Sequence, residues 1–256
     1  MTEIWTAWPR RFTIAGHESA IEWRFGVSFV TSARVELLLG SDIGDWVLTA
    51  VDPSLISCVV TQTEDIAQHA SDLGVRSSER PEGAARALSV HFPRVLSANE
   101  LGRYERAYNL HPGYLPWGRG TFPLVWAIWL GEPAGATLHR MVANVDAGPI
   151  VARRRIRLRQ SETAYEVFLR IRAVEYRMFA EWWPRIAAVT ELPERPQCGA
   201  GSSHSRAEFN RLLDVDPSTL DSVSLQRLRR ALAFPGRPGL RADESDARPS
   251  VPFNAG

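Results

Sequence analysis

The chain has 256 residues, of which 45% are hydrophobic, so it can bury the core of one sizeable domain, alone or with a small appendage. Its formal net charge is +1, and this balance argues against bulk binding of nucleic acid, which requires a basic excess to neutralise phosphates. The sequence has no run of about 18 or more apolar residues, so we expect no helix that spans a membrane.

The cysteines and the first residues indicate a compartment. Cys58 and Cys198 have neither metal-ligand spacing nor a disulfide framework. Residues 1–11 contain charges and tryptophans where a signal peptide would have an apolar run. We therefore expect a cytoplasmic protein in a reducing environment, with no bound metal and no membrane partner.

Residues 1–32 form an N-terminal extension of uncertain structure, in which only the alternation of residues 25–30 indicates a strand. From residue 33, apolar runs typical of buried strands alternate with amphipathic helical segments. The predicted strands are residues 35–39, 55–60, 88–92, 107–110, 135–139 and 150–158, and the predicted helices among them are residues 43–50, 64–73 and 124–130. This alternation predicts an α/β fold, a Rossmann-like and mostly parallel sheet with helices on both faces.

Local signals predict where several helices begin. Asp42 is expected to cap the first helix and Thr121 the helix at residues 124–130. Thr163 and Glu166 have capping-box spacing, so a long helix should follow them, and Pro184 should kink or end it.

The segment before that helix and the C-terminal part of the chain are less regular. Alternate arginines from Arg153 to Arg159 share one face of a predicted strand. We interpret this face as exposed to solvent, and the alternative is a row of arginines that binds phosphate. Residues 191–240 are predicted to be a small C-terminal subdomain with short helices, appended to a main domain at residues 33–190. Residues 241–256 are polar and expected to be disordered.

The most specific segment runs from Asn109 to Gly120. It begins at the end of a predicted strand and continues into a loop rich in proline and glycine, where ligand sites of open parallel sheets lie. Asn109 and His111 are two residues apart, so on a strand their side chains point to the same face. An amide and an imidazole should therefore lie side by side at the mouth of a loop.

Three motifs in order resemble one family. Asn109 to Pro112 with Leu115-Pro116, then Gly135 to His139, then Asp146 to Ile150 are similar to the formyltetrahydrofolate-dependent formyltransferases. The Leu115 to Gly120 segment looks most like that of the sugar N-formyltransferases, which act on amino sugars carried on nucleoside diphosphates. The resemblance covers residues 33–190 well and residues 200–240 more weakly, and it implies the formyltransferase fold with 10-formyltetrahydrofolate as co-substrate.

The resemblance implies that Asn109, His111 and Asp146 are the catalytic set. An amide N–H can donate to the oxyanion that forms when an amine attacks a formyl carbon. An imidazole can accept the proton that the attacking nitrogen loses at neutral pH. Asp146 would then orient His111, fix its tautomer or hold a water that relays protons.

The resemblance also implies binding residues. The pterin ring of the folate should lie along two loops, formed by His91, Phe92, Pro93, Arg94, Val95 and Leu96 and by Val142, Ala143 and Asn144. Arg119 is expected to hold a substrate phosphate or to tether its loop, and Trp117 to cover the substrate pocket or to pack. His139 is interpreted as structural.

Other functions remain open. The acceptor could be glycinamide ribonucleotide or an amino acid derivative, or water in a folate deformylase, and the fold could also serve a non-catalytic module that binds a folate or a nucleotide sugar. Methionyl-tRNA is disfavoured as an acceptor because the tail is short and the charge balanced. Neither the amino sugar nor the oligomeric state is determined, and a homodimer is one option.

Overall fold

The computed structural model describes residues 13–14, 17–18, 34–237 and 239–241. The chain divides into two compact units, residues 1–32 and 33–256. In the first, β1 (Thr13–Ile14) and β2 (His17–Glu18) form an antiparallel pair. The strand predicted at residues 25–30 lies outside the described residues, as does the tail predicted to be disordered at 241–256, except for residue 241.

The second unit is built on a seven-stranded sheet with the order β10-β9-β7-β6-β3-β4-β5. Its strands are β3 (Val35–Leu39), β4 (Ile56–Val60), β5 (Ser77–Ser78), β6 (Arg86–Val90), β7 (Arg106–His111), β9 (Ala134–Arg140) and β10 (Ile150–Ile156). The five strands from β7 to β5 are parallel to one another. At the other edge, β9 is antiparallel to β7, and β10 is antiparallel to β9. The predicted mostly parallel sheet is confirmed.

Helices and short segments connect these strands. They are α1 (Ser41–Ala50), η1 (Pro53–Leu55), α2 (Glu64–Asp72), α3 (Ala98–Leu101), α4 (Pro123–Leu130), α5 (Ala164–Ala187), α6 (Arg206–Leu213), η2 (Pro217–Thr219) and α7 (Ser222–Leu232). A short strand β8 (Arg119–Gly120) pairs in parallel with β11 (Ser203–His204). No helix in this described part of the chain has the length and apolar composition needed to cross a lipid bilayer.

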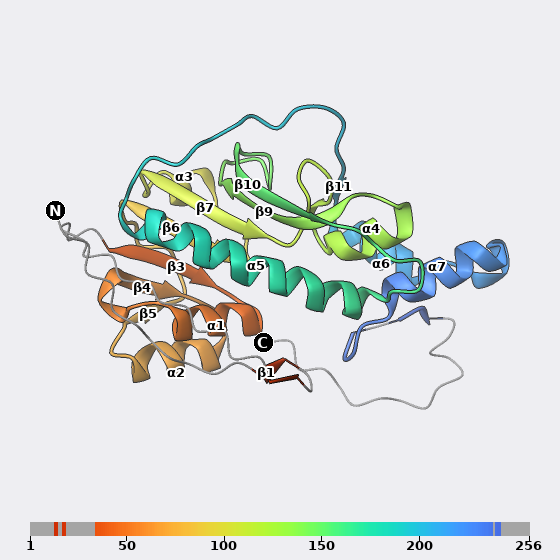
Figure 1. Cartoon of the computed structure of the whole chain (residues 1–256), viewed down its shortest axis with the longest axis horizontal. Coiled ribbons are helices and arrows are strands. Elements are labelled where there is room, and N and C mark those ends of the chain that lie inside the picture. Colours follow the sequence, from red (N-terminus) through yellow and green to blue (C-terminus); the bar gives the residue numbers. More distant parts are fainter. Residues whose placement is uncertain (1–12, 15–16, 19–33, 238, 242–256) are drawn as a thin grey trace. The chain divides into compact units, whose positions relative to one another are not determined.

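Helices cover both faces of the sheet. The long helix α5 crosses one face (Figure 1), where Trp46 of α1 packs against Tyr176 and Phe179 of α5. Leu38 points to the opposite face and packs in one cluster with Tyr104 and, from α3, Leu101. Because side chains alternate along a strand, β3 contributes to both layers, and all five of its residues are buried.

Two predicted helix caps are wrong. The N-cap of α1 is Gly40, and Asp42 lies inside the helix, where its carboxylate pairs with Arg172 at 2.7 Å. The N-cap of α4 is Phe122, whose φ of 54° and lack of a polar side chain leave Thr121 no capping role. The capping box of Thr163 and Glu166 is confirmed at the start of α5. Pro184 lies in the last turns of that helix, which continues to Ala187.

Candidate functional site

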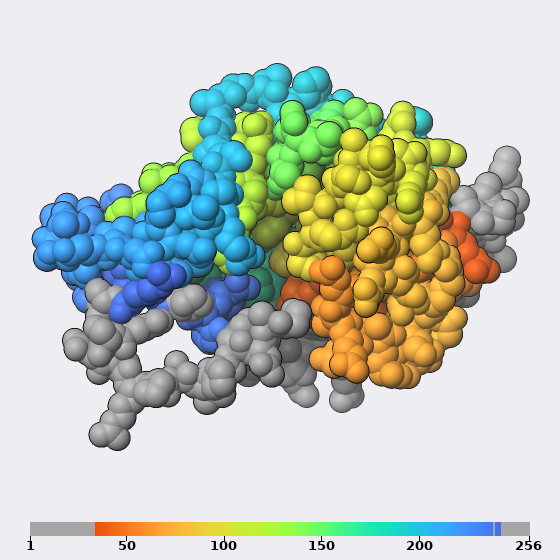
Figure 2. Space-filling model, turned by 180° about the vertical axis from the view of Figure 1, so that it is seen from behind, coloured from red at the N-terminus to blue at the C-terminus, as the bar shows by residue number. Residues whose placement is uncertain are grey.

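The site lies where β6 and β7 end side by side. Ser89 pairs with Asn109 in the parallel register, and β7 continues through His111. These strand ends line a cavity of about 350 Å³. On the face drawn in Figure 2, a hollow separates the yellow part of the chain from the blue C-terminal helices. The cavity is of the size typical of small-molecule sites.

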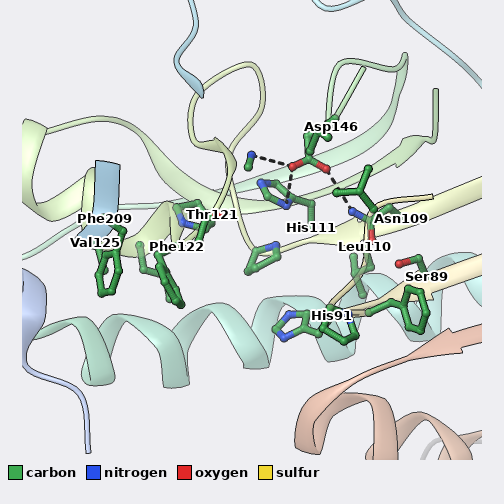
Figure 3. A pocket seen from close by; sticks show the side chains of 18 of the residues that line it. Ser89, His91, Asn109, Leu110, His111, Thr121, Phe122, Val125, Asp146 and Phe209 are labelled. Atoms are coloured by element: carbon green, nitrogen blue, oxygen red, sulfur yellow. Dashed lines mark hydrogen bonds and ion pairs between the residues drawn. The ribbon is translucent and has the colours of Figure 1, made fainter. Parts of the chain in front are cut away.

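Asp146 is the centre of the polar cluster in this cavity. Its carboxylate accepts the backbone N–H of Gly120 at 2.9 Å and an N–H of the Asn109 amide at 3.4 Å. The same carboxylate lies 3.6 Å from Nδ1 of His111 and 3.4 Å from Nε2 of His139. Figure 3 shows it above Asn109 and His111, which both lie on β7. The structure therefore brings together the three residues predicted as a catalytic set.

The backbone of this cluster is unusual at two points. Asp146 has φ of 51°, a conformation that costs a non-glycine residue on the order of 1–3 kcal/mol and is found mainly where surrounding contacts impose it. Gly120 has φ of 83°, and a Cβ atom there would lie 2.4 Å from the carbonyl oxygen of His204. Only glycine therefore lets the 118–121 segment approach closely enough to donate its N–H to Asp146.

Hydrogen bonds determine the tautomer of His111. Its Nε2 lies 2.8 Å from the carbonyl oxygen of Gly118. A carbonyl only accepts, so Nε2 carries the hydrogen and Nδ1 is the atom free to take up a proton. Nδ1 faces the carboxylate of Asp146, which would stabilise the resulting imidazolium.

Burial and neighbouring charges give His111 and Asp146 different protonation states. Burial lowers the pKa of His111 below its ordinary value, and the charge of Asp146 offsets this only in part. Burial alone would raise the pKa of Asp146, but the charge of His111 and the hydrogen bond from His139 outweigh it and hold that pKa well below its usual range. At neutral pH the site therefore contains a neutral imidazole beside an ionised carboxylate.

His139, interpreted from the sequence as structural, lines the cavity. It is the cross-strand neighbour of Asn109, and its Nε2 lies 3.3 Å from the Asn109 amide nitrogen. Its Nδ1 lies 2.9 Å from the carbonyl oxygen of Arg140. His139 thus lies beside both the amide of Asn109 and the carboxylate of Asp146. The antiparallel pairing of β9 with β7, which places it there, has no local signal in the sequence.

The predicted folate-binding residues fall into two groups. All six residues from His91 to Leu96 line the cavity, as does Val142, whereas Ala143 and Asn144 are not part of the lining. His91 has φ of 52°, and its Nε2 lies 2.9 Å from the fully buried carboxylate of Glu175 on α5. The first of the two predicted loops therefore forms one wall of the cavity, and only part of the second does.

The structure does not bring Trp117 or Arg119 to the cavity lining. The Arg119 guanidinium instead donates to the side-chain oxygen of Gln197 at 3.1 and 2.7 Å. Of the two roles predicted for Arg119, the structure shows the loop tether, and neither residue shows contact with the cavity. The predicted binding of substrate by Trp117 and Arg119 stays a prediction.

The end of the cavity away from His91 is aromatic. Phe122 and Phe209 lie there in Figure 3, with ring centroids 4.2 Å apart, and Phe234 and Arg237 complete this end. None of these residues was predicted from the sequence, because they come from separate elements, α4, α6 and the segment after α7. The described residues hold no group of three or more His, Cys, Asp or Glu side chains arranged to bind a metal ion.

Comparisons with known proteins agree with this geometry. A model of the Formyl transferase family matches residues 56–182, which include Asn109, His111 and Asp146. The dTDP-4-amino-4,6-dideoxyglucose formyltransferase of Mycobacterium tuberculosis is 29% identical over 160 residues, 62% of this chain and 68% of the relative.

Solved structures share the fold. A 4-N formyltransferase from Francisella tularensis has a TM-score of 0.70 at 16% identity, and the match covers 80% of this chain and 90% of that one. The N-formyltransferase from Helicobacter canadensis, solved with folinic acid and dTDP-3-aminofucose, has a TM-score of 0.69 at 18% identity, with 79% of this chain and 81% of that chain covered. Residues 56–182 of the chain thus match the Formyl transferase family, and the chain shares the fold of solved formyltransferases.

Proposed function

We propose that this protein is an enzyme that transfers the formyl group of 10-formyltetrahydrofolate to the amino group of a nucleotide-linked amino sugar. The observation that carries the proposal is the convergence of Asn109, His111 and Asp146 at one cavity, with the carboxylate 3.4 Å from the amide and 3.6 Å from the imidazole. The relatives from Mycobacterium tuberculosis and Helicobacter canadensis support it, because their names or bound ligands specify dTDP-linked amino sugars and, in the second, a folate.

Each group has a chemical role in that reaction. The amine nitrogen forms a bond to the formyl carbon, and the bond from that carbon to N10 of the folate breaks. Asn109 donates an N–H to the formyl oxygen while negative charge develops on it. His111 accepts at Nδ1 the proton that the amine nitrogen loses and returns a proton to N10 as the folate leaves. Asp146 stabilises the imidazolium in between.

The nucleotide is assigned to the aromatic end of the cavity. The guanidinium carbons of Arg206 and Arg237 lie 5.0 and 5.1 Å from the ring centroid of Phe122, and Arg237 also lies 5.0 Å from that of Phe234. Among the residues that the structure describes, no carboxylate forms an ion pair with either arginine. Two like charges that share one ring are suited to a diphosphate, which would neutralise both.

Alanine at Arg237 tests this assignment. Loss of a charge-assisted contact to phosphate, worth about 1.5–3 kcal/mol, should raise the KM for the nucleotide sugar about 10-fold to 10²-fold and leave the KM for the folate unchanged. The matched control is Arg227→Ala, since Arg227 is exposed on α7 and outside the cavity lining. Equal KM values for the two variants would refute the assignment.

The pH profile tests the roles of His111 and Asp146. Because a neutral His111 is required and its pKa is lowered, the rate at saturating substrates should fall with acid only below about pH 6.5. Asp146 raises the pKa of His111, so Asp146→Asn should move this acid limb to still lower pH as well as slowing the reaction. If the acid limb instead reported titration of the substrate amine, Asp146→Asn would leave the limb at the same pH. That result would contradict the assignment.

The function itself is tested by a screen. Purified protein is supplied with 10-formyltetrahydrofolate and a panel of nucleoside-diphosphate amino sugars, together with glycinamide ribonucleotide, and release of tetrahydrofolate is followed. We expect release that depends on one or a few amino sugars. Release without any amine would indicate a deformylase, and binding of folate without release would indicate a non-catalytic module.

A further inference from the structure

We propose that Gln197 is a positioning residue that holds Asp146 against His111 from outside the cavity, an inference that rests on the proposed function. Its amide nitrogen donates to the carbonyl oxygens of Asp146 and Gly148 at 2.7 and 2.8 Å. Its amide oxygen accepts both N–H groups of Arg119 already described. Both hydrogens and the oxygen of this amide are therefore used, and no other uncharged side chain of this length offers that combination.

These bonds join the two segments that determine where the Asp146 carboxylate lies. The 146–148 turn supplies the carboxylate from a backbone with φ of 51°. The 119–120 strand supplies the N–H of Gly120, which the carboxylate accepts at 2.9 Å. Gln197 fixes the turn through its nitrogen and the strand through Arg119, so one side chain links turn and strand in addition to the bond from Gly120.

Hydrogen bonds also hold the segment around Arg119. The side-chain oxygen of Ser202 accepts the backbone N–H of Gly118 at 2.8 Å, and its carbonyl oxygen accepts the backbone N–H of Arg119 at 3.1 Å. The carbonyl oxygen of His204 accepts the backbone N–H of Thr121 at 2.8 Å. The residues on either side of Gln197, Pro196 and Cys198, are exposed. Because apolar burial does not hold this stretch, a change at Gln197 should alter the geometry of Asp146 more than the stability of the fold.

Gln197→Glu is the sharpest test. The variant keeps the shape of the side chain and the bond to Arg119, but its carboxylate faces the carbonyl oxygens of Asp146 and Gly148 and can donate to neither. We expect kcat to fall about 10-fold to 10²-fold, as small misplacements of a reacting group do, with KM for both substrates within about threefold. Gln68→Glu is the control, because it removes a side-chain hydrogen bond to Asp72 on α2, far from the site.

A second variant separates positioning from general damage. If Arg119 acts on Asp146 through Gln197, Arg119→Ala should lower kcat, and adding it to Gln197→Glu should cost less than the sum of the two single effects. Additive losses, or a Gln197→Glu variant whose kcat is within twofold of the wild type, would overturn the proposal. So would a loss of kcat accompanied by an equal loss of folate binding and a lower Tm.

A spectroscopic readout keeps this test independent of turnover. Nuclear magnetic resonance of labelled histidines follows the titration of His111, which a displaced Asp146 would move to lower pH in Gln197→Glu and leave unchanged in Gln68→Glu. If the wild-type protein transfers no formyl group, the proposed function fails, and this titration still decides the role of Gln197. An unshifted His111 would overturn that role.

Discussion

Replacement of His111 by alanine is expected to reduce kcat by about 10²–10⁴-fold, the range typical of a lost general base. The physical reason is that Nδ1 of His111 is a proton acceptor that is neutral at pH 7 and lies beside a carboxylate that stabilises its protonated form. Release of tetrahydrofolate at saturating concentrations of both substrates measures the effect. The affinity for folate should change little, because both nitrogens of the imidazole face groups of the protein, the carbonyl oxygen of Gly118 and the carboxylate of Asp146.

The control for this variant is His69→Ala. His69 lies on α2, where its Nδ1 is 2.7 Å from Asp45, and it has no part in the cavity lining. Its loss should leave kcat within about twofold of the wild type. Circular dichroism and Tm should show both variants folded. A His111→Ala enzyme that keeps a near wild-type rate would exclude His111 as the base.

Replacement of Asn109 by alanine is expected to reduce kcat by about 10²–10³-fold, since a lost donor to an oxyanion typically costs this much. Asp146 accepts one N–H of the amide at 3.4 Å, so the amide is oriented before substrate arrives and its second N–H is left for the formyl oxygen. Unlike the loss of His111, this change should leave the acid limb of the pH profile nearly where it is, because Asn109 does not titrate.

Asn99→Ala on α3 is the matched control, since Asn99 is exposed and outside the lining of the cavity. It should behave as the wild type. Asn109→Asp separates donor loss from lost volume, because the aspartate has the same shape and lacks the N–H groups. A variant that is as active with aspartate as with asparagine would contradict the role of Asn109 as a donor.

Much of the candidate site could be predicted because its signals are local. Asn109 and His111 lie two residues apart on one strand, and a strand period of two places them on the same face in any fold. Glycine and proline in the following loop indicated the mouth of a site. Asp146 was predicted through the resemblance of its motif to a family, since nothing in its own neighbourhood requires it to face His111.

The errors in the predicted helix caps have the opposite cause, because tertiary contacts outweigh the local signals there. Asp42 and Thr121 have side chains suited to capping, but tertiary contacts take the chain elsewhere. Asp42 pairs with Arg172 on α5, a residue 130 positions away, and Thr121 is held by the bond between its own N–H and His204. Capping preferences of about 1 kcal/mol are outweighed by such contacts.

Alternation of apolar runs and turn residues was enough to predict a mostly parallel α/β sheet, because hydrophobic period and turn chemistry act within a few residues. The polar trio at its rim was predicted from the resemblance of three short motifs to a family. Folding alone recruited His139 through an antiparallel strand, Gln197 across 51 residues to Asp146, and Arg237 to Phe122 at the aromatic end of the cavity. Contacts of that span depend on how strands and helices pack against one another, and no pattern of neighbouring residues encodes them.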